Sequence, residues 1–243
     1  MENQSTDLSY QNITQISEAD SSRRFIANVF LWMAVALGVS GGFSWYFATD
    51  AGLLQLLINP ATGGRTGLGT IVVFTPLAFV LLMSFGLNRL SLPVLTFLFL
   101  AFACLMGMSL SFIFLVYTLG SIVNVFVTAS LLFGVMAIAG YTTHQDLTGF
   151  GSILRMLVFG LVIAMLVNWF VGSAQMDYII SFIGVAVFVG LTAYDVQKLK
   201  RIGAGMEYGD AASGKMVIMG ALTLYLDFIN MFLFLLRLFG SRK

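Results

Sequence analysis

A carboxyl group lies in the middle of the most apolar stretch near the end of the chain. Residues 216–236 read MVIMGALTLYLDFINMFLFLL, with Asp227 close to the centre. An ionised carboxylate is costly at the middle of a bilayer, so an acid in this position is by default a candidate for an ion or proton pathway. A second acid, Asp195, lies near the end of an earlier apolar stretch, whereas the other acids fall in the N-terminal segment, in predicted loops or at span ends. These two carboxyl groups are therefore the candidate site.

Helical geometry predicts which polar residues accompany the two acids. At about 100° per residue, Thr223, Asp227 and Asn230 fall within a wedge of about 80° on one helix. Thr192 shares a face with Asp195 on the preceding helix. Because the other faces of both helices carry Phe, Leu, Ile and Val, we expect the polar faces to point into a bundle, with these residues supporting the carboxyl groups.

Two facing carboxyl groups in a medium of low dielectric constant cannot easily both ionise, so they would share one proton. The protonated pair would clamp its two helices together, and the deprotonated pair would repel and offer oxygen ligands to a hard cation. Calcium takes six to eight oxygens, so Asp195 and Asp227 with nearby Thr, Asn and water form only a weak metal site, which suits conduction. We expect no other cofactor.

Purely structural roles for the two acids stay open at this point. A lone Asp in a span can simply bond to a neighbouring helix. Asp195 also lies beside Lys198, so a salt bridge near a helix end would account for it.

Composition makes the chain a membrane protein. Of its residues, 59% are hydrophobic and only 9% are charged, and the mean hydropathy is +0.95. So few polar groups cannot cover the surface of a soluble domain. The net charge of +1 gives no basic field for nucleic acid, so the lipid bilayer is the expected partner.

The hydrophobic stretches predict an all-α fold with seven transmembrane helices, because each is close to the roughly 20 residues that a span needs. Before them, residues 1–22 are polar and predict a disordered cytoplasmic tail, followed by a seven-helix transmembrane domain over residues 23–243. The predicted spans cover residues 25–48, 68–88, 92–116, 121–141, 153–172, 177–197 and 216–237.

The distribution of Lys and Arg favours a cytoplasmic N-terminus. In that orientation eight basic residues lie inside and four outside. Three of those four belong to the C-terminal end, which seven full spans place outside and a re-entrant last segment would place inside. We prefer seven spans because the last segment is long enough to cross.

Three segments carry a resemblance to a known family: GYTTHQDLTGFGSIL after the fourth span, FVGLTAYDVQKLK at the end of the sixth, and the seventh span itself. Together they resemble the transmembrane Bax inhibitor motif (Bax inhibitor 1) family, especially its bacterial inner-membrane members, over about residues 23–243. The resemblance implies a multi-pass inner-membrane protein whose seventh helix is central in the bundle. It also implies a pH-sensitive calcium leak channel whose sensor aspartates are Asp195 and Asp227.

The resemblance further implies a latch. In a bacterial relative an arginine of the second helix binds the sixth-helix aspartate in the closed state. Here Arg89, near the cytoplasmic end of the second span, is the only candidate.

Three functions compete. The first is a cation leak, with calcium the transported ion. The second is a membrane regulator that binds a partner, such as a membrane protease or a cell-death factor, without transporting ions. The third is an intramembrane aspartyl protease, which also needs two aspartates on neighbouring helices. Its Gly-x-Gly-Asp motif is absent, because Leu224-Tyr225-Leu226 precedes Asp227, so we predict that the chain is not an enzyme.

Overall fold

The computed structural model describes residues 2–206 and 211–243, with side chains from residue 20 to 206 and from 212 onward. In these parts the regular structure is helical, apart from two isolated backbone bridges. The helices are α1 Glu2–Thr49, α2 Ala51–Leu57, α3 Gly67–Gly86, α4 Leu92–Leu110, α5 Ile113–Val116, α6 Leu119–Thr142, α7 Thr148–Val171, α8 Ala174–Ala204 and α9 Ala211–Phe239.

Seven helical segments of the described chain are long and apolar enough to cross a membrane. The third span joins α4 and α5. This confirms the predicted class, an all-α membrane protein with seven candidate spans. The segments are Asp20–Thr49, Gly67–Gly86, Leu92–Val116, Leu119–Thr142, Thr148–Val171, Ala174–Ala204 and Ala212–Phe239.

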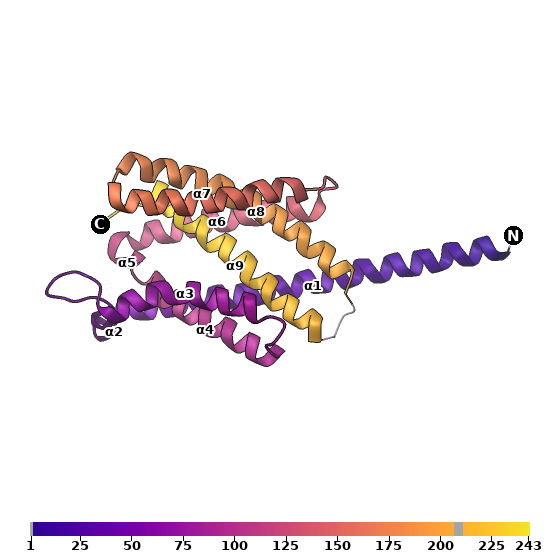
Figure 1. Ribbon diagram of the computed structural model, residues 1–243, viewed down its shortest axis with the longest axis horizontal. Helices are drawn as coiled ribbons and strands as arrows, with labels where there is room; N and C mark the ends of the chain where they lie inside the picture. The colour runs from indigo at the N-terminus through magenta and orange to yellow at the C-terminus, as the bar shows by residue number, and fades with distance from the viewer. Residues whose placement is uncertain (1, 207–210) are drawn as a thin grey trace.

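The spans form two groups with α9 between them (Figure 1). One group contains α6, α7 and α8, and the other contains α1, α3 and α4. The last helix packs on α8 and α6 from the first group and on α1 and α4 from the second. It is also the most buried of the seven spans. That all six other spans surround α9 stays a prediction, because α3 packs mainly on α4, and α7 mainly on α8.

Contacts between connections define the two ends of the bundle. At the end that we call the inner end, the Lys215 ammonium donates to the carbonyl oxygen of Leu87 at 3.4 Å. At the opposite, outer end, the C-terminal residues lie along the α5–α6 connection, where the N–H of Thr118 donates to the carbonyl oxygen of Ser241 at 3.1 Å. The last helix therefore runs from one end of the bundle to the other, as the preferred seven-span arrangement requires.

The N-terminal segment differs from the expectation of a disordered tail. Residues 2–22 are helical and continue into the first span as one helix, α1, which extends beyond the bundle in Figure 1. Residues 2–22 contain neither Pro nor Gly, so nothing in that segment breaks a helix that has already formed in the span. Its location in the cytoplasm stays a prediction.

Candidate functional site

The two candidate acids lie on the helix pair α8–α9. Asp195 belongs to the last third of α8 and is 9% exposed, and Asp227 lies near the middle of α9 and is 4% exposed. Both carboxyl groups are thus buried inside the bundle. The sequence predicted that Asp227 would lie deep in the seventh span and Asp195 near the end of the sixth.

The structure brings the two side chains together. The carboxyl groups of Asp195 and Asp227 lie within hydrogen-bonding reach of each other across the α8–α9 contact. A carboxylate oxygen only accepts hydrogen bonds, so a bond between two carboxyl groups requires a proton on one of them. The Oδ2 atom of Asp227 is buried and has no hydrogen-bond partner among the described residues.

Positive charge reaches Asp195 from two sides. Lys198 on α8 and Arg155 on α7 both act on its carboxyl group electrostatically, and the Arg155 guanidinium lies 5.2 Å from the ring centroid of Tyr194. Of the other helices that pack here, α4 and α6 contain no charged residue. The α1 helix contributes Asp20, Arg23 and Arg24, next to Ser22, whose hydroxyl donates to the carbonyl oxygen of Lys200 at 2.9 Å. Asp195 is thus the member of the pair nearer the charged inner end.

The three predicted supporting residues hydrogen-bond within their own helices. The hydroxyl of Thr192 is buried and donates to the Phe188 carbonyl at 2.8 Å. Thr223 donates to Met219 at 3.0 Å, and the Asn230 amide donates to Leu226 at 2.8 Å. Their donors are therefore occupied, and their support for the carboxyl pair stays a prediction.

The predicted latch residue is not at the pair. Arg89 is exposed in the connection between α3 and α4. The described residues contain two ion pairs, Arg201–Asp146 at 2.7 Å and Arg237–Asp177 at 3.8 Å, and neither involves Arg89. In this conformation the cations beside Asp195 are Lys198 and Arg155, which the resemblance did not indicate. An Arg89 latch remains a prediction for another state.

Small residues allow the helices that carry the pair to approach closely, as is usual between membrane helices. A methyl group added at Gly140 on α6 would collide with the backbone of Ala193, two residues before Asp195. A methyl group at Gly184 on α8 would collide with the ring of Phe234 on α9. Glycine is thus required at both contacts, and together they hold α6, α8 and α9 in register around the carboxyl groups.

One feature that the sequence did not predict is a clamp formed by α8 on the connection between α6 and α7. Gln197 accepts a hydrogen bond from the N–H of Leu147 at 2.9 Å and donates to the carbonyl of Gln145 at 2.7 Å. One turn later, Arg201 donates to Asp146 at 2.7 Å. Two of the segments that carry the family resemblance therefore bind each other here, a contact that a helical wheel cannot reveal.

The clamp also sets the charge state of Asp146. Hydrogen bonds from Thr148 and Arg201 hold the pKa of this exposed carboxyl well below its usual range. Because Asp146 lies outside the spans, its ionised form faces water and carries the ion pair to Arg201.

A second unpredicted feature is a buried hydroxyl network on the other side of α9. The hydroxyls of Tyr225 on α9 and Ser40 on α1 are 2.7 Å apart. Ser40 also lies 2.8 Å from the carbonyl oxygens of Ala36 and Ala103. Both side chains are almost wholly buried, so this network fixes α9 against α1 and α4.

The two carboxyl groups do not form a closed metal centre. Among the residues described, no group of three or more His, Cys, Asp or Glu side chains comes together. A calcium ion at the pair would take most of its oxygen ligands from water or neutral groups, since it needs six to eight. The donor set therefore fits a weakly held, passing ion better than a resident one.

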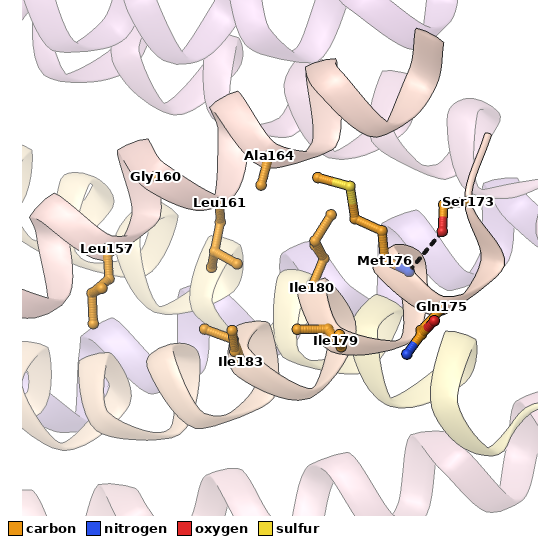
Figure 2. A pocket seen from close by; sticks show the side chains of 10 residues that line it. All are labelled: Leu157, Gly160, Leu161, Ala164, Ser173, Gln175, Met176, Ile179, Ile180 and Ile183. Carbon is orange, nitrogen blue, oxygen red and sulfur yellow. Dashed lines mark hydrogen bonds between the residues drawn. The ribbon is translucent and has the colours of Figure 1, made fainter. Parts of the chain in front are cut away.

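An apolar groove is lined by residues other than the two acids (Figure 2). It has a volume of about 450 Å³ and lies between α7 and α8. Aliphatic side chains such as Leu161 and Ile180 line it, and at one end Ser173 accepts a hydrogen bond from the N–H of Met176 at 3.2 Å. No ionisable side chain lines this groove.

Comparison with known proteins places these features in a family. The family model described as "Inhibitor of apoptosis-promoting Bax1" matches residues 22–243. The chain belongs to the Bax inhibitor 1 family. The match begins close to the predicted start of the transmembrane domain and covers all seven spans.

Full-length bacterial relatives agree with this assignment. The inner membrane protein YbhL of Escherichia coli K12 is 44% identical over 220 residues, which cover 90% of this chain and 92% of the relative. An uncharacterised protein, RP147, of Rickettsia prowazekii is 41% identical over 224 residues, covering 91% of both chains. With its seven apolar helices, this member of the Bax inhibitor 1 family is a multi-pass protein of the inner membrane, as the sequence predicted.

Proposed function

We propose that the protein is a pH-sensitive leak for cations, chiefly calcium, and that the Asp195–Asp227 pair controls it. The observation that carries the proposal is that two buried carboxyl groups on adjacent helices lie within hydrogen-bonding reach of each other. A hydrogen bond between them requires a proton, so this contact depends on pH in a way that an ordinary helix contact does not.

The direction of the pH effect follows from charge. With one proton, the pair binds α8 to α9. When the pH rises and the proton leaves, two carboxylates face each other in a medium of low dielectric constant and repel. The α8–α9 contact then loosens, and the freed oxygens attract a hard cation. We assign the shared proton to Asp227, because the basic residues Lys198 and Arg155 lie on the Asp195 side of the pair.

Calcium efflux from liposomes tests the proposal. Protein reconstituted in liposomes should release calcium faster at about pH 8 than at about pH 6. Asp227→Asn should abolish this difference, because the amide donates to Asp195 without a titratable proton. The double variant Asp195→Asn/Asp227→Asn should likewise respond weakly to pH. A pH response that persists in the double variant would refute the role of the pair.

Asp50→Asn is a matched control. Asp50 is an exposed acid that caps α2 by accepting a hydrogen bond from Leu53 at 3.0 Å. Asparagine caps a helix as well as aspartate does, so this variant loses one carboxyl group without losing structure. Its pH response should equal that of the wild type.

A regulatory role is the second candidate, and it rests on the clamped connection. Gln197 and Arg201 hold this segment in one conformation at the inner end, with His144 exposed, so it can present a defined surface to a membrane-protein partner. Stoichiometric co-purification that survives Asp195→Asn/Asp227→Asn but is lost with Arg201→Ala would support this role. We propose no enzymatic activity, and aspartate-dependent cleavage of a transmembrane peptide would contradict that.

A further inference from the structure

A second polar cavity lies in the outer half of the bundle, between α6 and α9. Its volume is about 460 Å³. Polar side chains from the first turns of α6 and from the C-terminal end line one side of it, and three apolar side chains complete it. The polar members are Thr118, Ser121, Asn124, Thr128 and Ser241. The apolar members are Val125, Leu235 and Phe239.

The unpaired amide of Asn124 favours water in the cavity, whereas the Thr128 hydroxyl donates within its own helix to the carbonyl oxygen of Asn124 at 2.9 Å. Asn124 and Thr128 are exposed, and they lie roughly 8 Å and 14 Å along α6 from its start, at 1.5 Å per residue. The Asn124 side-chain amide has no hydrogen-bond partner among the described residues. Lipid cannot hydrogen-bond, so exposed polar groups at this depth face water or protein.

The lining suits a hydrated cation. Hydroxyl and amide oxygens are ligands that a hard cation accepts, and none of the side chains that line the cavity is charged. The basic C-terminal residues point elsewhere: the Lys243 ammonium donates to the carbonyl oxygen of Phe114 at 2.7 Å, and Arg242 lines a separate pocket beside Asp177. Neutral oxygens bind weakly, as a site through which ions pass requires.

Aromatic side chains fill the α6–α9 contact in the next turns. Phe126 of α6 packs edge to face on Phe228 and Phe232 of α9, with ring centroids 5.4 Å and 5.9 Å apart. Phe133 packs on Phe228 at 5.6 Å. The residue beside Phe228 in the sequence is Asp227. Along α6, Phe126 lies between the cavity-lining residues Asn124 and Thr128. Phe133 follows them and precedes Gly140, which packs against the segment of α8 just before Asp195.

We propose that this cavity is the hydrated outer vestibule of the cation route, and that Phe126, Phe133, Phe228 and Phe232 form a plug between it and the Asp195–Asp227 pair. The role of the plug rests on the proposed function, whereas the hydration of the vestibule does not. Side chains of this kind close a pore by excluding water from a narrow passage.

Cysteine accessibility tests the vestibule without any flux measurement. In a Cys104→Ser background, Asn124→Cys and Thr128→Cys should react with a charged, membrane-impermeant thiol reagent about ten-fold faster than Val127→Cys, because the thiolate forms only in water. Val127 lies at the same depth, is 51% exposed and does not line the cavity, so it is the matched control. Equal rates at the three positions would overturn the vestibule.

Truncation of Phe126 tests the plug. Phe126 is 42% exposed, so Phe126→Ala should leave the fold intact while opening a path for water. Calcium efflux should rise several-fold, because a hydrophobic barrier to water and ions is removed. A cysteine introduced by Ala129→Cys, at a position that is fully buried in the parent protein, should become reactive. Phe159→Ala on α7, where the side chain is 73% exposed to lipid, should change neither quantity.

The outcomes separate the two claims. If Phe126→Ala changes neither efflux nor the reactivity of Ala129→Cys, the plug is overturned. If the wild type shows no calcium flux at all, the proposed leak and the plug both fail. The labelling rates at Asn124→Cys and Thr128→Cys still decide whether the vestibule holds water.

Discussion

Asp227 of α9 and Asp195 of α8 lie within hydrogen-bonding reach of each other inside the bundle, although both side chains are acids. A carboxyl group stranded in a membrane span is unstable as an isolated charge. The neighbouring acid removes that difficulty only while the two hold a proton. The same contact that makes Asp227 tolerable therefore makes the α8–α9 interface sensitive to pH.

The close approach at Gly140 should be necessary for this interface. Gly140→Ala places a methyl group against the backbone of Ala193, so it should lower the thermal stability in detergent and weaken the pH response of calcium efflux. Gly134→Ala, on the same helix with open space around it, is the control. It should be neutral or stabilising by up to about 1 kcal/mol, since alanine favours the helix. Equal effects of the two substitutions would contradict the packing argument.

The Ser40–Tyr225 network predicts that Ser40→Ala lowers the free energy of unfolding more than Tyr225→Phe does. Tyr225→Phe removes one hydrogen bond, while Ser40 keeps its two carbonyl partners, so the cost should be about 1 kcal/mol. Ser40→Ala leaves the buried Tyr225 hydroxyl without that partner and should cost about 1–3 kcal/mol. Thermal or denaturant unfolding in detergent measures both.

The double variant provides the control for this asymmetry. Adding Tyr225→Phe to Ser40→Ala removes the unsatisfied hydroxyl, so the double variant should be more stable than the Ser40→Ala single variant. If Tyr225→Phe proves the more damaging single change, the network does not act as described.

The clamp on the 143–147 connection should withstand moderate acid. Because the pKa of Asp146 is lowered in the fold, its stabilising contribution is present at neutral pH and is lost only as the pH falls through that lowered value. A spin label at His144→Cys should therefore keep its mobility from neutral pH down past about pH 4, the ordinary value for Asp. Arg201→Gln should raise the mobility already at neutral pH. A wild-type transition near pH 4 would show that the ion pair is not formed.

The sequence predicted more of the fold than of the candidate site. Hydrophobic length predicted the seven spans, because a bilayer fixes the length of a crossing helix. The free-energy cost of placing a carboxylate within a membrane span singled out Asp195 and Asp227 as candidate site residues. Helical periodicity then gave the face of each helix that these acids occupy, but not which helix it meets, since rotation and neighbours are set by packing. The contact between the pair was an expectation that only three-dimensional placement could address.

Other features lay beyond a sequence pattern for physical reasons. Gln197 and Arg201 bind a connection about 50 residues away, and Ser40 meets Tyr225 across 185 positions. Such partners depend on tertiary packing, not on local spacing. Residues 2–22 are helical although their polar composition predicted disorder; the segment contains neither Pro nor Gly, the residues that most readily end a helix that continues from a span.

Infrared spectroscopy of the reconstituted protein tests the shared proton most directly. The carbonyl stretch of a protonated carboxylic acid should be present in wild-type protein at about pH 5 and should fade by about pH 8, over the interval in which calcium efflux rises. The part of the band that is lost between these pH values should be much weaker in Asp195→Asn/Asp227→Asn, where only the other acids of the chain contribute. A band that does not change with pH in the wild type, or that changes equally in the double variant, would contradict the account.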